Sequence, residues 1–397
     1  MRIVYFTHSL ASCWNHGNAH FLRGVLRELI ARGHDVRALE PAGNWSLGNL
    51  LADGGEAGLE PYRAAYPELS SESFAADADP ESLVGDAELV IVHEWSEPAL
   101  VAAIGELRKR GGRFTLLFHD THHRAVSDPE AIRAFDLSGY DGVLAFGEAL
   151  SAVYRRWGWG NRVWTWHEAA DTRHFHPPAE EGERSGLVWI GNWGDGERTA
   201  EIEDFLLRPA AYARLPLDIY GVRYPDEAKA MLARHGAHYR GWAPNARAPE
   251  ILARHLATIH VPRRYYATIL PGIPTIRVFE ALACGIPLVS APWADAEHLF
   301  RPGQDYLTAG DGAEMTRRLI ALRDDAALRE ALVASGLETI RARHSCTHRV
   351  DELLAIVSQL APSHREPEAR QAEAAPAARD PSFRWDDDKE HNSEIAA

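Results

Sequence analysis

The sequence predicts an α/β protein built from two doubly wound domains, and three observations support that class. Short apolar runs alternate with amphipathic helical segments as far as about residue 166, and the alternation restarts at residue 187 after a charged, proline-containing run. Strands that alternate with helices are typical of a parallel sheet covered on both faces. The length of 397 residues also suits two such domains with an appendage.

The first domain is predicted at residues 1–168. It opens with an apolar strand, Ile3–Phe6, which a loop of small residues joins to a helix whose apolar side chains recur at helical spacing until Gly33. A Gly-, Ala- and Ser-rich stretch then runs from about residue 42 to 86. The remaining elements are expected as strands at 36–39, 89–92, 114–118, 143–146 and 163–166, and as helices at 97–110 and 147–157.

Residues 169–186 are interpreted as a linker, because prolines, charges and glycines interrupt the pattern there. The second domain is predicted at 187–345, followed by a C-terminal helix at 346–361 and an acidic, disordered tail at 362–397. The pattern is helical throughout from 326 to about 360. Strands of the second domain are expected at 187–190, 217–220, 238–240, 258–261, 288–290 and 306–307, with helices at 198–213, 226–235, 247–255, 275–284 and 312–323.

Composition limits the kinds of partner. The net charge of −15 argues against a protein that wraps nucleic acid by bulk electrostatics, although a local arginine cluster could still hold a phosphate group. Only three of the 42 basic residues are lysines, Lys109, Lys229 and Lys389, and none lies in the motifs described below. A bound diphosphate would therefore have to be held by arginine and backbone amides.

The cysteines and the N-terminus point to a cytoplasmic protein. The three cysteines, Cys13, Cys284 and Cys346, form neither a disulfide framework nor a zinc motif, which suits a reducing compartment. The opening apolar run is short and lacks a clear cleavage site, so we interpret it as a strand rather than a signal peptide. No window is apolar over the ~18 residues that cross a bilayer, and peripheral contact with a membrane stays open.

The most specific segment is LPGIPTIRVFEALACGIPLVSAPW, from Leu270 to Trp293. Pro274 and Thr275 suit a helix start and Gly285 suits its end. Glu280 falls in the middle of that helix, where a buried carboxylate would need a basic partner or a ligand's hydroxyl groups. The unpaired N–H groups at the helix start would form an anion site. On residue types alone, a capped helix with an ordinary surface glutamate is the more common interpretation.

The part FEALACGIPLVSAPW resembles the nucleotide-sugar signature of GT-B glycosyltransferases, in the retaining group related to sucrose and mannosyl transferases, and most closely the CgeB-like (spore maturation protein) branch. The resemblance covers residues 1–360 in element order and implies two Rossmann-like domains that face a central cleft. It implies that Glu280 binds the ribose of a donor nucleotide, while Gly272, Ile273, Pro274 and Thr275 hold its diphosphate. Relatives usually have a second glutamate where this chain has Gly272, which leaves the donor sugar open.

A second segment, LVWIGNWGDGERTAEIEDF, is a strand followed by a glycine-rich loop and a helix. In the relatives an Arg directly after the first glycine and a later Lys reach the diphosphate. Gly191 with Asn192 and then Arg198 stand at these places here, and Arg198 can act as a bidentate phosphate ligand or be a solvated helix-start residue. Arg263 and Arg264 are further candidates for the same cleft.

Two loops are expected to border the cleft. In HSLASCWNHGNAHFLRG, Gly17 and Asn18 are the candidates for close backbone approach to a ligand, although an ordinary turn fits equally well. In GWAPNARAPE, Trp242 would stack on the nucleobase, or simply pack. Asp171 in AADTRHFHP matches a linker motif of the family and is expected to have a structural role.

Histidines follow two strands of the first domain, in VIVHEWSEP and LLFHDTHH, where parallel strands place ligands. The resemblance assigns His119 to the donor sugar or its developing oxocarbenium ion, and we expect His93 at the cleft. A histidine bound to neighbouring backbone is the alternative for His119. A metal site of His93, His119, Asp120 and His122 is a rival, but relatives work without a metal, and none is expected here.

Together these observations predict a cytoplasmic, bacterial, metal-independent hexosyltransferase. It would use a UDP-sugar as substrate, need no cofactor, and transfer the sugar with retention to an unidentified glycan, lipid or protein. Two alternatives remain: a sugar-nucleotide epimerase of the same fold, and a non-catalytic assembly protein with a relic nucleotide pocket, for which Gly272 is the supporting feature.

Overall fold

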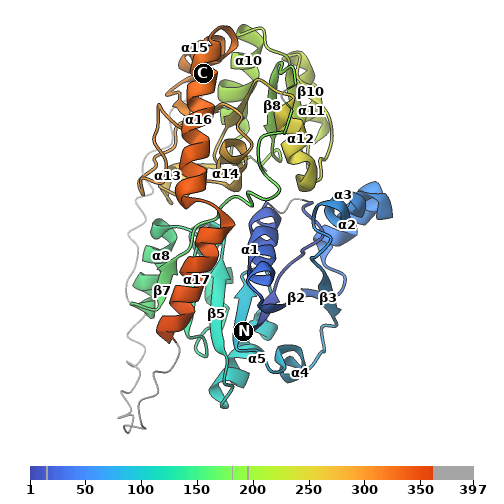
Figure 1. The fold of residues 1–397 in the computed structure, drawn as a ribbon, viewed down its shortest axis with the longest axis vertical. Coiled ribbons are helices and arrows are strands. Elements are labelled where there is room, and N and C mark those ends of the chain that lie inside the picture. Colours follow the sequence, from blue (N-terminus) through green and yellow to red (C-terminus); the bar gives the residue numbers. More distant parts are fainter. Residues whose placement is uncertain (15–16, 181, 195, 361–397) are drawn as a thin grey trace, which may run out of the picture. The chain divides into compact units, whose positions relative to one another are not determined.

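The computed structural model describes residues 1–14, 17–180, 182–194 and 196–360, and it contains two parallel sheets (Figure 1). The first sheet is complete at residue 165 and the second begins at residue 187, so the predicted α/β class is confirmed. The predicted tail at 362–397 lies outside the described residues.

The first sheet has seven strands in the order β3-β2-β1-β4-β5-β6-β7, all parallel to their neighbours. Ile3 pairs with Val36 on one side and with Leu89 on the other, so the chain order reverses between β1 and β4. In such sheets ligands bind beyond the carboxyl ends of the strands at this point. The strands are β1(Arg2–Phe6), β2(Asp35–Pro41), β3(Ser71–Phe74), β4(Leu89–His93), β5(Thr115–Asp120), β6(Gly142–Ala145) and β7(Val163–Thr165).

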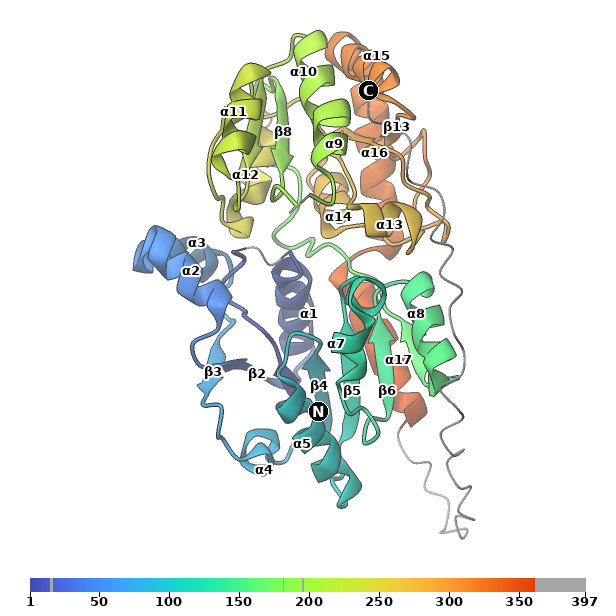
Figure 2. The ribbon, with the colours of Figure 1, turned by 180° about the vertical axis from the view of Figure 1, so that it is seen from behind.

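Different helices cover the two faces of this sheet, because successive strand residues point to opposite faces. Ile3 and Leu117 pack in one cluster with α1 and α17, whereas Val4 and Leu116 pack in another with α5, α7 and α8. Figure 1 shows α1 and α17 over the nearer face, and Figure 2 shows α5 and α7 from behind. The helices are α1(Ala19–Ala31), α5(Pro98–Lys109), α6(Arg124–Ser127), α7(Pro129–Arg133), α8(Glu148–Tyr154) with the wider turn η2(Arg155–Trp159), and α17(Cys346–Leu360).

The stretch from 42 to 86 contains elements that the sequence analysis did not predict. The strand β3 lies at the sheet edge and its side chains are mostly exposed, so it lacks the apolar run of a buried strand. The helices here are short, although Asn44 caps α2 and Asp79 with Pro80 starts α4. They are α2(Trp45–Gly54), η1(Glu56–Leu59), α3(Glu60–Ala65) and α4(Pro80–Val84).

The second sheet repeats this plan with six parallel strands in the order β10-β9-β8-β11-β12-β13. The chain order reverses between β8 and β11, which again defines a ligand-binding edge. The strands are β8(Leu187–Ile190), β9(Leu217–Tyr220), β10(His238–Tyr239), β11(Ala257–His260), β12(Leu288–Ser290) and β13(Leu307–Thr308).

The helix predicted at 198–213 is divided into three parts. Pro209 has no N–H to donate, and the turn before it widens. The helices of this half are α9(Thr199–Ile202), η3(Glu203–Leu207), α10(Arg208–Tyr212), α11(Asp226–Arg234), η4(Asn245–Arg247), α12(Ala248–Ala253), α13(Arg264–Thr268), α14(Ile276–Ala283), α15(Gly312–Asp324) and α16(Ala326–Arg343).

The last described helix, α17, packs against α1 and so returns to the first sheet. Gly24 permits this contact, because a Cβ there would lie 2.4 Å from the Sγ of Cys346. The indole N–H of Trp166 also donates to the carbonyl of Arg349 over 2.8 Å. The helical run from 326 to 360 therefore breaks near His344 so that its second part can cover the first sheet.

Within the described ranges, no helix has both the length and the apolar character that crossing a membrane requires.

Candidate functional site

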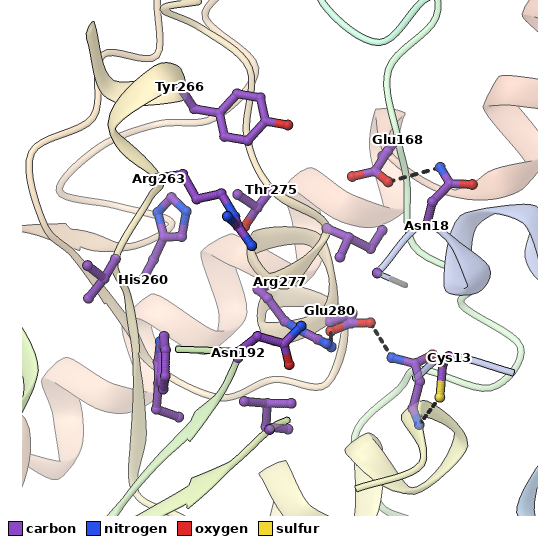
Figure 3. A pocket seen from close by; sticks show the side chains of 18 of the residues that line it. Cys13, Asn18, Glu168, Asn192, His260, Arg263, Tyr266, Thr275, Arg277 and Glu280 are labelled. Carbon is purple, nitrogen blue, oxygen red and sulfur yellow. Dashed lines mark hydrogen bonds and ion pairs between the residues drawn. The ribbon is translucent and has the colours of Figure 1, made fainter. Parts of the chain in front are cut away.

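A cavity of about 410 Å³ lies where the carboxyl ends of both sheets meet (Figure 3). The loops that follow strands β1, β4, β5, β8, β9 and β11 contribute to its walls, as the two points of reversed strand order predict. Its size is that of a small-molecule site. We call the residues before 166 the first-half wall and those after 187 the second-half wall.

Glu280 lies on α14 and faces the cavity, although the residue is only 1% exposed. Its Oε1 accepts hydrogen bonds from Nδ1 of His20 at 3.0 Å and from Nδ2 of Asn245 at 2.6 Å, and its Oε2 pairs with Arg277. Figure 3 shows Arg277 and Glu280 side by side. A carboxylate has about four lone-pair sites, so roughly one, on Oε2, remains for a ligand hydroxyl group.

Burial by itself would raise the pKa of Glu280, but Arg277, His20 and Asn245 together lower it to about 2. The carboxyl group is therefore ionised at any physiological pH. A buried carboxylate held in this way is a fixed hydrogen-bond acceptor. The surface glutamate that residue types alone would suggest is excluded by this position.

His20 connects the two halves through this cluster. Its Nε2 accepts the backbone N–H of Asp171 over 2.8 Å, so Nε2 carries no proton and Nδ1 donates to Glu280. Asp171 also accepts the backbone N–H of Arg173 and pairs with Arg27 at 3.3 Å. The predicted structural role of Asp171 thus corresponds to a turn that orients His20.

Glu168, the last residue of the predicted first domain, lines the cavity, although the sequence analysis does not single it out as a site residue. It is 6% exposed, and its Oε1 accepts from Nδ2 of Asn18 over 3.2 Å (Figure 3). Burial raises its pKa to about 8, with a further contribution from the charge of Glu280. Glu168 is therefore a neutral carboxylic acid at neutral pH.

Arginine supplies the positive charge of the cavity, and no lysine lines it among the described residues. Among the described residues of its wall, four guanidinium groups face three carboxyl groups, those of Glu168, Glu197 and Glu280, and burial raises the pKa of Glu168 to about 8. Cationic groups therefore outnumber anionic ones in this part of the wall, which favours an anionic ligand. The four arginines are Arg198, Arg223, Arg263 and Arg277.

Arg198 lines the cavity as predicted, and two of its five N–H donors bond within the protein, whereas its buried Nε has no partner among the described residues. Its Nη1 and Nη2 donate to the carbonyls of Val261 and Asn192 over 3.0 and 2.8 Å. Burial lowers its pKa to about 10, so the guanidinium stays charged at neutral pH. Arg198 thus holds the loops after β8 and β11 together while adding charge to the cavity.

The diphosphate loop lies differently from the prediction. The backbone N–H of Gly272 donates to the carbonyl of Ala294 over 2.8 Å, and Ile273 is buried beside Gly147. Neither these two residues nor Pro274 line the cavity, whereas Thr275, Ile276 and Arg277 do. The expectation that the 272–274 amides face a ligand is wrong, because these residues connect α14 to the core.

Arg264 is a second correction. Its Nε donates to Glu201 over 2.8 Å on an exposed surface, and it does not line the cavity. The neighbouring Arg263 does line it and pairs with Glu197 at 2.6 Å. The other residues that the sequence analysis assigns to the nucleotide site or the cleft loop do line the cavity. They are Gly17, Asn18, Gly191, Asn192, Arg198, Trp242, Thr275 and Glu280.

His119 and His93 do not line the cavity. His119 is fully buried against Tyr5 and Trp166, and burial lowers its pKa to about 3. His93 is 1% exposed and contacts the hydroxyl of Thr121 over 3.1 Å. Both belong to strands, whose side chains point to the faces of the sheet rather than beyond its edge. The contact with a donor sugar expected of His119 is therefore not supported by its position.

The residues that follow β5 reach the cavity instead: Thr121, His122 and His123 line it. Among the described residues, no group of three His, Cys, Asp or Glu side chains is arranged to hold a metal ion. The metal site considered for His93, His119, Asp120 and His122 is thus not formed.

Comparisons with known proteins bear on the fold. Residues 198–355 match a family model described as glycosyl transferase-like, and among curated proteins none matches the chain by sequence. An alpha-glucosyltransferase in complex with UDP and DNA shares 13% identity with this chain, covering 90% of it and 99% of the other, with a TM-score of 0.63. Anabaena HepE in complex with UDP and glucose shares 13%, covering 90% and 100%, with a TM-score of 0.60.

The T4 phage beta-glucosyltransferase is similar to the same extent, with 12% identity, 91% and 100% coverage and a TM-score of 0.56. The architecture of this chain is therefore that of the GT-B glycosyltransferases, as the sequence predicted.

Proposed function

We propose that this protein is a GT-B glycosyltransferase of the retaining, CgeB-like branch, which transfers a hexose from a UDP-sugar to an acceptor. The observation that carries the proposal is Glu280, an ionised carboxylate fixed in the cavity wall with one lone-pair site left. The family match at 198–355, which contains α14, and the similarity to structures that hold UDP support it.

In this proposal the second-half wall holds the nucleotide. Glu280 accepts a hydrogen bond from the ribose, and Trp242 stacks on the uracil ring. Three partners hold the carboxylate before the ligand arrives, so its side chain loses little conformational entropy on binding.

The diphosphate lies between the start of α14 and the arginines. Thr275 and Arg277 face the cavity there, and the helix dipole favours negative charge. When the bond from the sugar to the diphosphate breaks, negative charge grows on the leaving oxygen. Arg263, Arg277 and Arg198 stabilise that charge because they are in place before the reaction.

The same arginines are the reason why we propose a reaction without a metal ion. Their excess of positive charge does what a divalent cation would do for the diphosphate. Activity that survives a chelator would support this proposal, and activity restored only by a divalent cation would contradict it. Retention is tested by NMR of the anomeric proton in the product. The spectrum is recorded early in the reaction, because later equilibration of the anomers would hide the configuration that the enzyme produces.

The proposed compartment is the cytoplasm, in agreement with the three free cysteines Cys13, Cys284 and Cys346. The acceptor is not defined by the nucleotide site.

A thermal-shift panel with UDP-, GDP-, ADP- and TDP-sugars tests the function. A ligand that binds only the folded protein raises the melting temperature, and we expect the UDP compounds to do so most strongly. Stabilisation by none of them would overturn the proposal. A stabilising sugar nucleotide that is rearranged without any acceptor would identify an epimerase, and tight UDP binding without turnover on any acceptor would favour a relic pocket.

A further inference from the structure

The first-half wall contains a continuous row of rings, which we call the aromatic row. Its rings come from four segments that are distant in sequence, and all of them line the cavity. The aromatic row consists of Trp45, His8, Trp95, His122 and His123.

Neighbouring rings of the row are in contact. The ring centroid of His8 lies 4.7 Å from that of Trp45 and 6.4 Å from that of Trp95. Trp95 lies 5.4 Å from His122, which lies 4.0 Å from His123. Trp45 is 41% exposed and lines the cavity, so part of its side chain is accessible to a ligand there.

The row carries no charge at neutral pH. Burial lowers the pKa of His8 and of His123 to about 4 and that of His122 well below its usual value. Two guanidinium groups act on its imidazoles. Arg124 stacks on Trp95 at 4.2 Å, pairs with the buried Glu94 and does not line the cavity, whereas Arg263 lines it from the second-half wall and pairs with Glu197.

The row nevertheless offers hydrogen bonds. The Nδ1 atom of His122 is buried and has no hydrogen-bond partner among the described residues. A buried polar atom without a partner is costly and indicates a missing ligand or water. Asn18 and Thr121 add polar groups beside the row.

We infer that the aromatic row binds the acceptor, and that the acceptor presents a neutral sugar ring. This inference rests on the proposed function. The C–H face of a sugar packs on an exposed indole, as other apolar surfaces do, while its hydroxyl groups reach the imidazole nitrogens. A nucleic acid or a phosphorylated acceptor would need cations, which this wall does not supply.

The test uses UDP-saturated protein and methyl glycosides of glucose, galactose and mannose in both anomeric forms. Saturation-transfer NMR should show contact with the ring protons of at least one glycoside. Trp45→Ala should weaken that binding at least tenfold, Trp45→Phe should retain most of it, and the affinity for UDP should stay within twofold in both variants. Trp159→Ala is the matched control, because Trp159 is a partly buried tryptophan that lies outside the cavity.

The outcomes are distinguishable. If UDP does not bind, the proposed function fails. If UDP binds but no methyl glycoside does, or if Trp45→Ala binds the glycoside as the parent protein does, the inference alone is overturned. A preference for glucose 1-phosphate or single-stranded DNA over every neutral glycoside would also overturn it. In a transfer assay, Trp45→Ala should raise the KM for the acceptor and leave the KM for the UDP-sugar unchanged.

Discussion

The two walls of the cavity differ in the kind of side chain that they present. Among the described residues, the second-half wall carries four arginines and the carboxyl groups of Glu197 and Glu280, whereas the first-half wall carries rings and polar groups. The folds of the two halves are nearly the same, with parallel strands and one reversal of strand order in each. The difference therefore resides in the loops at the carboxyl edges of the sheets.

The contrast shows that two halves with the same architecture can present different kinds of side chain to a ligand when only their loops differ. Charges recognise the anionic half of a sugar nucleotide, and rings recognise a neutral partner. The two walls meet at Glu280, to which His20 from the first half and Asn245 from the second both donate. Variants that remove one wall's contribution should leave the other wall's ligand bound.

The largest effect is expected where the walls meet. His20→Ala leaves Glu280 buried without one of its partners and opens a hole beside Phe175, whose ring lies 3.9 Å from the imidazole. Loss of such a partner in the core costs about 2–4 kcal/mol of folding free energy. Denaturant unfolding measures it, with His34→Ala at the N-terminal surface as control. A cost below about 1 kcal/mol would show that Glu280 is not held as described.

A pH-dependent effect is expected from Glu168. Its pKa is about 8 in the folded protein against the ordinary glutamate value of 4.5, so the folded state binds one more proton between these pH values and stability falls as pH rises through that window. In Glu168→Gln, the free energy of unfolding should decline less steeply with pH than in the parent protein, by up to about 1.4 kcal/mol per pH unit. Denaturant unfolding of both proteins from pH 5 to 8.5 measures it. Equal slopes would mean that Glu168 is ionised in the fold.

A smaller effect separates two adjacent arginines. Arg263→Ala removes a guanidinium from the cavity, so the affinity for UDP should fall about tenfold, or about 1.4 kcal/mol, while the affinity for uridine changes little. Arg264→Ala is the matched control, because Arg264 pairs with Glu201 outside the cavity. Isothermal titration calorimetry measures both. If both variants lost the same affinity for UDP, the proposed difference between an arginine in the cavity and one outside it would be wrong.

The sequence predicted the interior of the fold well, for a physical reason. Strands such as β4 and β5 are buried on both faces and appear as continuous apolar runs. The edge strand β3 is mostly exposed and has no such run. The last helix begins at Cys346, where the sequence predicts it, but its packing against α1 is not contained in the local pattern.

The site was predicted only in part. Glu280 was found because its motif is local, but its partner His20 lies 260 residues away, and no spacing rule connects the two. His119 lies within β5, where side chains point to the sheet faces, and it does not line the cavity. His122 and His123, which follow that strand in the segment LLFHDTHH, line the cavity, as a position beyond the carboxyl end of a parallel strand predicts.

The most direct test of the proposed nucleotide site is calorimetry of UDP and uridine with the parent protein and with Glu280→Gln, which keeps the side-chain volume. Because Glu280 is proposed to bind the ribose, we expect the variant to lose at least tenfold in affinity, about 1.4 kcal/mol, for both ligands alike. Circular dichroism confirms that the variant is folded. Unchanged affinity of the folded variant for both ligands would contradict the role of Glu280 and with it the assignment of the second-half wall to the nucleotide.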